Sequence, residues 1–446
     1  MTTATAPRRG RFFRVVPDTM ARRRLDWRAM VALSALWFAI SYLWNTLGLI
    51  VLPVLVNRTV HPTPVDLGVF TMTIDKNTYL AILEGIGTIF AVIWQPAIGA
   101  LSDHSRFAIG RRRPYIAIGV VGDVVFLSLM AIVTSYWVLL AVYIGLQAFS
   151  NTAQGPYQGM LPDQVPDDQR GQASGFYGGL QMAGILIGFF IIGVVLIPNH
   201  QLTLAILSIA LVIAITGALV VAAVPDVQTT RPPREGLARS IALSFVIDVK
   251  RYPDFAWLMA SRLLFLVALV GIESFVLNFM EDTFRLSEAR ASLYTGYLLI
   301  AITGLAAVIS TTAGHLSERF GRKPFVAAAC LIGALGAGLL IFAQSVISVL
   351  IFGAILGVAA GIFLSVDWAF ATDLIPKSEA GRYMGVSNIA TAGSGIIGRF
   401  LMGPIIDYFN HGRTSTAGYR VMFGVGLAFF VLAFVTLRPV REIKIE

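Results

Sequence analysis

The sequence contains two stretches that repeat each other on either side of its midpoint. Residues 99–114 read GALSDHSRFAIGRRRP, and residues 314–324 read GHLSERFGRKP. Both place Gly-x-Leu-Ser-acid at the end of one long apolar run and continue through a Gly-Arg-basic-Pro cluster into the next run. This repeat predicts a chain built from two like halves. A second pair of stretches keeps four residue types 210 positions apart: Asp163 and Asp373, Pro166 and Pro376, Gly171 and Gly381, Gly175 and Gly385.

Apolar runs of membrane-crossing length recur from end to end of the chain. Charged residues make up only 13% of it, against about 25% in a soluble domain. A bilayer is crossed by about 20 apolar residues, and backbone groups in lipid need partners within their own segment, which favours helices. We therefore expect an all-α membrane protein of two pseudo-symmetric six-helix bundles. The twelve predicted transmembrane helices are 29–56, 77–101, 114–134, 136–161, 171–197, 202–224, 255–280, 289–313, 325–343, 346–374, 383–408 and 417–437.

The longest polar connection divides the predicted helices six and six. In its second part Leu237, Ile241 and Phe245 recur at i, i+4 and i+8, which favours a short helix at the membrane surface. Two like halves in a membrane can rock against each other around a central site, as transporters do. The predicted layout is a tail at 1–28, a first bundle at 29–224, a linker at 225–254, a second bundle at 255–437 and a tail at 438–446.

The basic residues are distributed unevenly between the two sides of the predicted membrane. The chain has 34 Lys and Arg residues and a net charge of +9. With a cytoplasmic N-terminus, 26 of the 34 fall in cytoplasmic segments, six in outer segments, and Arg262 and Arg399 inside spans. This positive-inside pattern places both termini of a multi-pass protein of the cell or inner membrane in the cytoplasm. Because topology explains the charge, we expect no nucleic-acid partner.

The sequence also argues against several other classes of site. Cys330, the only cysteine, falls inside a span, so the sequence predicts no disulfide within the chain and no thiol-ligated metal. The sequence has no GxxxxGK[ST] phosphate-binding loop and no cluster of catalytic side chains on any loop. We expect a protein that is not an enzyme and needs no cofactor.

Four segments make the sequence similar to a known family. They are WQPAIGALSD at 94–103, GRRRPYI at 110–116, NTAQGPYQGMLPD at 151–163 and YPDFAWLMASR at 252–262. With the doubled motif they resemble the major facilitator superfamily, and within it the sucrose–proton symporter group, a neighbour of the glycoside–cation symporters. The resemblance covers almost the whole chain. It implies the two-bundle fold, proton-coupled uptake of a glycoside and a seventh helix that lines the central cavity.

The sequence departs from the plant sucrose carriers in its fourth predicted helix. Those carriers have an Asp and an Arg where this chain has Gln147 and Gln158. A glutamine can still hydrogen-bond a sugar but cannot titrate. Proton coupling is therefore either absent from this position or carried by another carboxylate.

Four acidic residues fall inside the predicted spans. A carboxylate in mid-bilayer costs about 2.5–3.5 kcal/mol on insertion scales, so each requires a reason. All five histidines fall in loops or at span ends, which leaves Glu84, Asp123, Glu273 and Asp367 as candidates for proton coupling. Glu273 is the first choice, because it follows Arg262 by eleven residues, close to three helical turns on one face. The alternatives are a static ion pair for Glu273, a structural pair for Asp123 and a solvated vestibule for Glu84.

Polar and aromatic residues within the spans are candidates for binding the solute. Asp367 stands beside Trp368, and such a pair suits a sugar, whose hydroxyls bond the acid while its apolar face stacks on the ring. A gate or capping role near the cytoplasmic mouth is the alternative for Asp367, and a lipid-facing or core position for Trp44. Arg262 could instead be an anchor at the cytoplasmic end, or a partner of Asp248 or Asp254. The substrate-binding candidates are Trp44, Asn45, Gln147, Asn151, Gln154, Gln158, Arg262 and Trp368.

The repeated motif predicts a latch at the cytoplasmic end of each half. Asp103 and Glu318 can pair with the arginines that follow them and with the N-terminus of a neighbouring helix. Such pairs would break when the halves rock. A purely topological role for the arginines is the alternative, although topology requires neither the acid nor the glycine. The predicted gating residues are Gly99, Asp103, Arg111, Arg112, Arg113, Gly314, Glu318 and Arg322.

These observations predict a monomeric secondary active transporter. It would carry a glycoside, a di- or oligosaccharide such as sucrose or maltose, together with a proton. Two alternatives remain open: proton-antiport efflux of amphipathic small molecules, and a non-transporting membrane assembly factor on the same fold.

Overall fold

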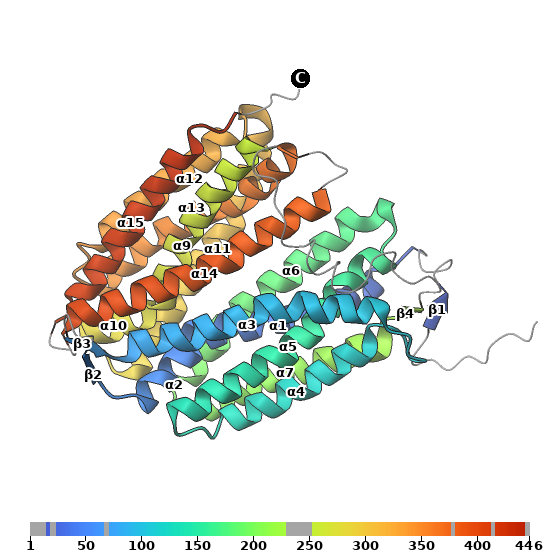
Figure 1. Ribbon diagram of the computed structural model, residues 1–446, viewed down its shortest axis with the longest axis horizontal. Helices are drawn as coiled ribbons and strands as arrows, with labels where there is room; N and C mark the ends of the chain where they lie inside the picture. The colour runs from blue at the N-terminus through green and yellow to red at the C-terminus, as the bar shows by residue number, and fades with distance from the viewer. Residues whose placement is uncertain are drawn as a thin grey trace, which may run out of the picture.

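The computed structural model describes residues 15–17, 24–66, 71–228, 252–375, 380–411 and 415–441. Within these ranges the chain forms twelve long helical rods, six before residue 229 and six after residue 251 (Figure 1). The first six are α1 (Trp27–Thr46) continued by η2 (Leu47–Val51) and α2 (Leu52–Thr59), α3 (Lys76–His104), α4 (Arg113–Met130), α5 (Tyr136–Gln164), α6 (Arg170–Gly188) continued by η4 (Phe189–Leu196), and α7 (Leu202–Ala223). The second six are α9 (Pro253–Ser274) continued by α10 (Val276–Phe284), α11 (Glu288–Phe320), α12 (Lys323–Leu340), α13 (Val346–Asp373), α14 (Ala380–Asn410) and α15 (Ala417–Leu437).

Each predicted span coincides with one rod, which confirms the fold predicted from the apolar runs. Ten rods of the described chain are long and apolar enough to cross a membrane, and the other two, α5 and α14, are 29 and 31 residues long. Helices α3 and α11 run on to His104 and Phe320, past their predicted ends, because the helix continues through the Gly-x-Leu-Ser-acid motif. The helix predicted within 237–250 lies outside the described residues.

Each bundle has its own apolar core. In the second bundle Phe265 of α9 stacks on Phe363 of α13, with ring centroids 3.7 Å apart. In the first bundle Trp37 of α1 packs against Tyr157 of α5 and Tyr177 of α6. Large apolar side chains stay exposed on the outer faces, as expected of surfaces that face lipid rather than water.

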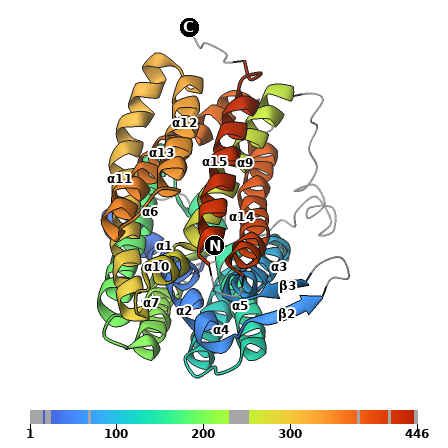
Figure 2. The ribbon, with the colours of Figure 1, turned by 90° about the vertical axis from the view of Figure 1, so that its left-hand side faces the viewer.

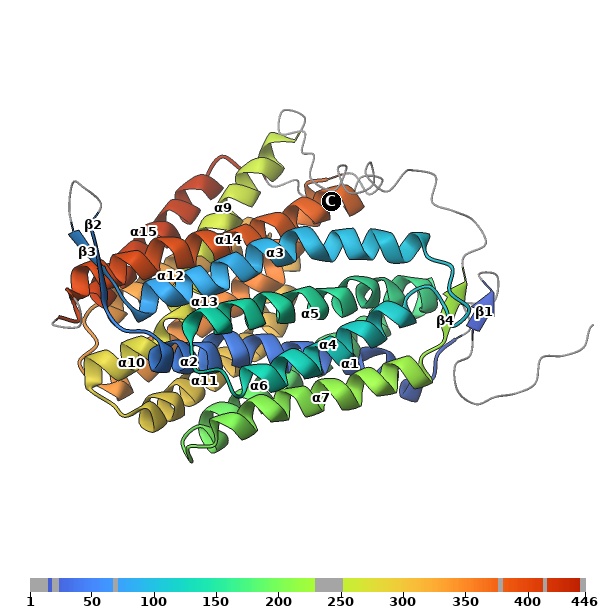
Figure 3. The same ribbon diagram turned by 60° about the horizontal axis from the view of Figure 1, so that its bottom comes forward.

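Two short strand pairs lie at opposite ends of the molecule (Figure 3). β2 (Thr63–Asp66) and β3 (Thr71–Ile74) form an antiparallel hairpin between α2 and α3. β1 (Val15–Pro17) pairs in parallel with β4 (Asp226–Gln228), which follows α7. The second pair joins the start of the chain to the segment that leaves the first bundle.

The two bundles meet at the end that carries α10 and the hairpin β2–β3, here called the closed end (Figures 1 and 2). There α3 and α14 lie side by side, and α11 packs against η4. A Cβ atom at Gly403 of α14 would lie 2.7 Å from the backbone oxygen of Asn77, which shows how closely the two helices approach.

The bundles separate toward the opposite end, here called the open end, where α14 and α3 diverge in Figure 1. Gly175 and Gly179 of α6 and Gly393 of α14 have no described atom within 4 Å of a Cβ built on them. The structure therefore represents a state that is sealed at one end and parted at the other.

Candidate functional site: a polar cavity between the bundles

A polar cavity of about 220 Å³ lies where α1, α3, α5 and α14 come together. Three of the four helices belong to the first bundle, and α14 belongs to the second. The structure thus brings four of the predicted site residues together: Glu84, Trp44, Gln147 and Asn151. The cavity is lined by Trp44, Gly48, Glu84, Thr88, Ala91, Tyr143, Gln147, Asn151 and Arg399.

An ion pair across the two bundles forms one wall of this cavity. Arg399 of α14 pairs through Nε with the carboxylate of Glu84 on α3, which is only 2% exposed. The same Nε donates to the hydroxyl oxygen of Ser274 on α9, 3.1 Å away. Gly48 makes room for Glu84, because a Cβ there would lie 3.3 Å from Oε1 of the carboxylate. Removing either charge alone would leave the other buried and unpaired, which costs about 3–5 kcal/mol in typical cases.

Neutral amides and aromatic rings form the opposite wall. Gln147 donates from Nε2 to the Tyr143 hydroxyl at 2.9 Å, and Asn151 donates from Nδ2 to Oε1 of Gln147 at 3.0 Å. Trp44 of α1 meets Tyr143 edge-on, with ring centroids 6.4 Å apart. These groups can donate and accept hydrogen bonds without changing charge, beside ring faces that pack on apolar surface.

Five of the eight predicted binding residues do not line the cavity, and three of these five lie in the first bundle. The Asn45 side chain bonds within its own helix, where its amide donates to the Ser41 carbonyl at 2.9 Å. Gln154 and Gln158 lie farther along α5, and Gln158 is exposed. Only the first of the two substituted positions of α5, Gln147, therefore faces the cavity.

Glu273 lies in α9 immediately before Ser274, the residue that accepts from Arg399. Its carboxylate is within electrostatic reach of the Arg399 guanidinium and has no hydrogen bond or ion pair to another described residue. It borders a second, smaller cavity of about 20 Å³ with apolar side chains such as Leu298 and Phe423. That volume is enough for about one water molecule.

Arg262 and Asp367 form a separate buried pair within the second bundle. Asp367 of α13 is fully buried and pairs with Arg262 of α9. The guanidinium also donates to Thr391 of α14 at 3.0 Å and lies 5.6 Å from the ring centroid of Trp368. Arg262 is therefore no terminal anchor.

Of the two residues proposed as alternative partners of Arg262, only Asp254 is among the described residues. The carboxylate of Asp254 instead accepts from the backbone N–H of Arg441 at 3.1 Å. Asp248 lies outside the described residues.

Asp123 is buried in α4 and borders neither cavity. Its carboxylate lies near the Ser150 side chain of α5. This placement agrees with the structural alternative for Asp123, a polar contact between neighbouring helices of the first bundle.

At the open end, the first copy of the repeated motif forms a compact ion-pair cluster. Arg112 reaches Asp103 at 3.2 Å and Asp163 at 2.9 Å, and Arg111 pairs with both acids as well. Burial lowers the pKa of Arg112. Burial acts in the same direction on Arg111, but the hydrogen bond and the charge of Asp163 outweigh it and leave its pKa raised. The predicted pairing of Asp103 is confirmed.

The start of α4 is capped by an acid from the segment after α7. Asp226 accepts from the backbone N–H groups of Arg112 at 2.8 Å and Arg113 at 2.9 Å. The Arg113 guanidinium donates to the Val224 carbonyl. The acid at this helix N-terminus is therefore Asp226, with its negative charge at the positive end of the helix.

The second copy of the motif does not repeat this arrangement. Glu318 is exposed and has no ion pair with any described residue, so its predicted pairing with Arg322 is wrong. Arg322 pairs instead with Asp373 of α13 at 2.9 Å, the counterpart of Asp163. The loop is shorter here, since α12 begins three residues after the end of α11. Gly314, Glu318 and Arg322 border an open groove of about 300 Å³.

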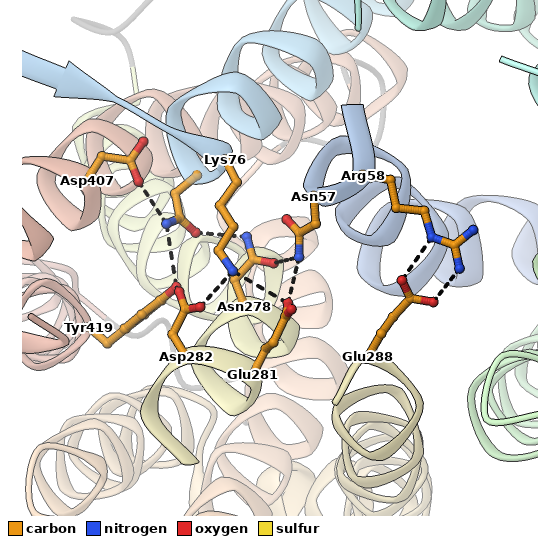
Figure 4. Close-up of polar contacts among 10 residues, drawn as sticks. Asn57, Arg58, Lys76, Asn278, Glu281, Asp282, Glu288, Asp407 and Tyr419 are labelled. Atoms are coloured by element: carbon orange, nitrogen blue, oxygen red, sulfur yellow. Dashed lines mark hydrogen bonds and ion pairs between the residues drawn. The ribbon is translucent and has the colours of Figure 1, made fainter. Parts of the chain in front are cut away.

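The closed end is sealed by a polar network between the bundles (Figure 4). Lys76 of α3 lies 2.7 Å from a carboxylate oxygen of Asp282 and 3.5 Å from one of Glu281, both on α10. Asn57 of α2 donates to Glu281 at 2.7 Å and to Asn278 at 3.0 Å. A further pair joins Arg58 of α2 to Glu288 of α11 at 2.7 Å.

An acid of the second bundle caps a helix of the first at the same end. Asp407 of α14 accepts from the backbone N–H of Asp75 at 2.9 Å and of Thr78 at 2.8 Å. It also accepts from the Asn77 side chain at 2.8 Å. These contacts satisfy donors at the start of α3 that have no partner within the helix.

Two sets of contacts join the bundles: the Arg399–Glu84 pair at the cavity and the polar network at the closed end. Neither could be identified from the sequence. In the sequence Arg399 is only a charge inside a span, although such a charge is a signal of function in itself. Arg58 and Lys76 are only charges of the outer segments. Nothing in the sequence indicates which residues of the other half they meet.

The fold and the site define a membrane transporter of two six-helix bundles. The model of the Major Facilitator Superfamily matches residues 27–398 and 305–446, and the chain belongs to that family. Its members are transporters rather than enzymes.

Solved structures of the same fold include distant transporters. The nucleoside transporter NupG, in a structure of a single-residue mutant, aligns with a TM-score of 0.68 at 13% identity over 92% of this chain and 99% of its own. A bacterial homologue of the human lysosomal transporter Spinster, in an inward-facing and occupied conformation, aligns with a TM-score of 0.69 at 14% identity over 93% of this chain and 95% of its own. At these identities the likeness shows the fold alone.

A relative by sequence is the multi-drug resistance efflux pump PmrA of Streptococcus pneumoniae. It is 28% identical over 174 residues, which is 38% of this chain. The match spans 41% of the length of the pump.

Proposed function

We propose that this protein takes up a glycoside, a di- or oligosaccharide such as sucrose or maltose, together with a proton by alternating access. The observation that carries the proposal is the cavity of about 220 Å³ between the bundles, which combines neutral amides, aromatic rings and a buried ion pair. Sugar hydroxyls bond amides, and the apolar faces of sugar rings pack on aromatic side chains. The likeness of residues 94–103, 110–116, 151–163 and 252–262 to the sucrose–proton symporters supports the same substrate class.

We also propose that the open end faces the cytoplasm and that the protein acts as a monomer. The open end carries both copies of the basic motif, and the positive-inside distribution of 26 against six basic residues supports this orientation. In this orientation the structure is an inward-facing state.

Alternating access then requires the contacts of the closed end to break. The pairs that join Lys76 to Asp282 and Arg58 to Glu288 would act as an outer gate. The cavity would open to the outside as the bundles close over the inner mouth.

The second candidate function is efflux by proton antiport. Two observations favour it: the similarity of part of the chain to PmrA, and the neutral Gln147 and Gln158 at positions that are charged in plant sucrose carriers. The cavity weighs against it, because its donors and acceptors suit a hydroxylated solute better than an amphipathic cation or a hydrocarbon.

Transport by the purified protein in liposomes separates the two functions. With an acidic exterior, radiolabelled sucrose or maltose should accumulate inside, and a protonophore should abolish the accumulation. The matched control is the same liposome without a pH gradient, which should equilibrate the sugar but not concentrate it. Extrusion of a preloaded amphipathic dye, with no movement of any glycoside in a panel, would replace this proposal by the second candidate.

A further inference from the structure

The outer surface of the first bundle carries an apolar groove between α4 and α5, here called the α4–α5 groove. It has a volume of about 410 Å³ and is lined by apolar residues within 117–126 of α4 and by Phe149 of α5. Helix α4 packs against α5 and α7, on the side of the first bundle away from the second (Figure 1). Ile118, Val121 and Val125 are exposed in the groove, as expected of a surface in contact with the membrane. The groove therefore opens to the bilayer and not to the path between the bundles.

Two aromatic rings line the α4–α5 groove, and two glycines make room for them. The rings of Phe126 on α4 and Phe149 on α5 stack with centroids 5.4 Å apart. A Cβ at Gly122 of α4 would overlap Phe149, and a Cβ at Gly145 of α5 would overlap Phe126. Each glycine thus lets the ring from the other helix pack directly against its own helix. The hollow therefore results from the way α4 packs on α5.

The α4–α5 groove is about as long as one leaflet of a membrane is thick. Its α4 residues run from Ala117 to Phe126, which is about 14 Å at 1.5 Å per residue. Half of a hydrocarbon core of about 30 Å is about 15 Å. The groove begins about one turn after Arg113, the first residue of α4, so most of it lies in the leaflet at the open end. This length and position suit the acyl chain of a lipid in that leaflet.

A positive charge stands at the end of the α4–α5 groove nearest the open end. Arg106, in the loop between α3 and α4, is exposed and has no hydrogen bond or ion pair with another described residue. Its neighbours hold the loop against α4. The hydroxyls of Ser105 and Tyr115 are 2.6 Å apart, and the ring of Phe107 meets that of Tyr115 edge-on with centroids 6.1 Å apart. Because Tyr115 precedes Ile118 of the groove by one turn, Arg106 lies at the level expected for the headgroup of a lipid bound there.

The surroundings of Arg106 favour an anionic headgroup. Phe107 and Ile109 expose apolar side chains beside it, a combination typical of segments at the membrane surface. The neighbouring arginines of the repeated motif already pair with acids of the chain. A guanidinium at this level attracts the phosphate of a lipid, and attracts an anionic lipid more strongly than a zwitterionic one.

A second copy of the chain would fit this surface less well. Two copies in one membrane share their orientation, so a two-fold axis between them would run along the membrane normal. The two Arg106 side chains would then lie at the same height beside the joined grooves and repel each other. An anionic lipid instead fills the apolar groove and neutralises the charge.

We propose that the α4–α5 groove binds an acyl chain of an anionic phospholipid, such as phosphatidylglycerol, whose phosphate pairs with Arg106. The site depends on neither the transported solute nor the coupling ion. Only its assignment to the inner leaflet rests on the orientation proposed above.

Native mass spectrometry of the purified protein, titrated with phosphatidylglycerol, measures the binding. We expect one lipid to be retained more strongly than any other, and phosphatidylcholine with the same chains to bind roughly fivefold more weakly, because one basic residue near the surface contributes about that factor. Arg106→Ala should remove this preference. The matched control Arg319→Ala, which removes an exposed arginine in the last turn of α11, should keep it.

A change in the shape of the α4–α5 groove tests the apolar part of the site. Val125→Trp places a bulky ring in the groove and should abolish the retained lipid. Leu129→Trp, one turn further along α4, is also exposed but lies outside the groove, so it should bind as the parent does. Elution of both variants as folded protein checks that a loss of binding is not a loss of structure.

Photolabelling locates the lipid in the unaltered protein. A phosphatidylglycerol with a diazirine in one acyl chain should label peptides within 117–126 in preference to the lipid-facing surface of α12. Even labelling of all exposed helices, or equal binding of the two lipids by the parent protein, would overturn the proposal. Cross-linking of two chains through α4 would also overturn it, because the groove would then be an interface between copies.

Discussion

Single polar residues in apolar surroundings mark the site of this protein. Glu84, Gln147 and Asn151 could be predicted because each is a polar residue in a span, and Trp44 because it is an aromatic residue among polar ones; the structure gathers the four around one cavity. The partner of Glu84 could not be predicted. Arg399 is more than 300 positions away, and the sequence does not fix how α3 and α14 are rotated about their axes.

Substrate affinity should depend most strongly on the side-chain amide of Gln147. Gln147→Leu removes two side-chain hydrogen bonds from the cavity wall. It also removes the amide that would bond a sugar hydroxyl, and at about 1 kcal/mol for one neutral hydrogen bond the Kd for a transported glycoside should rise about fivefold. Counterflow of radiolabelled sugar measures this. Gln158→Leu, on the same helix but outside the cavity, should leave the Kd unchanged, and an equal loss in both variants would contradict the site.

At the scale of the helices, the two copies of the motif show what a sequence repeat does and does not specify. The repeat correctly predicts that arginines and acids pair at the helix ends of the open end. It does not predict which acid is used, because the shorter second loop leaves Glu318 exposed and gives Arg322 to Asp373. Which acid an arginine can reach depends on where each helix ends, and helix ends are the part of a span that a sequence predicts least well.

Helix α5 packs so closely against the first copy of the repeated motif that one added methyl group should disrupt the contact. A Cβ at Gly159 would overlap the Arg112 guanidinium. Gly159→Ala should therefore expel Arg112 from Asp103 and Asp163, at a cost of about 1–3 kcal/mol. Thermal unfolding in detergent measures the loss. Gly175→Ala on α6, where a Cβ meets no described atom, should not lower the melting temperature. Equal melting temperatures for the two variants would argue against the packing described here.

The cap that α14 supplies to α3 should bias the conformational equilibrium. Asp407→Ala removes an acceptor for the N–H groups of Asp75 and Thr78 only while the closed end is closed. Loss of a helix cap costs about 1 kcal/mol, so the inward-facing population should fall about fivefold. The rate of thiol labelling of Gly179→Cys on α6, measured on the Cys330→Ala background, reports the opening of the inner mouth and therefore the shift. Glu318→Ala, which removes an exposed acid at the other end, should have no effect.

At the scale of the whole molecule, the sequence does not predict which end of the two-bundle arrangement is closed and which is open. The apolar runs predict twelve helices, and the repeat predicts two halves, because length and pattern fix both. The same sequence must also form the opposite state. No pattern in it can therefore show that Lys76 and Arg58 contact the second bundle in the state described here.

Locking the closed end should stop transport. The side chains of Asn57 and Asn278 are 3.0 Å apart across the bundles. On the Cys330→Ala background, the double variant Asn57→Cys/Asn278→Cys should lose glycoside uptake after treatment with a short bifunctional thiol reagent, because the outer gate cannot open. Each single variant, treated in the same way, should keep its uptake. Undiminished uptake after complete cross-linking would contradict movement at this end.

The ion pairs of the first bundle join three helix ends at the open mouth. Arg111 and Arg112, at the start of α4, both reach Asp103 at the end of α3 and Asp163 at the end of α5. These three ends are thereby tied together, so they should keep their mutual arrangement and travel as one body when the mouth narrows.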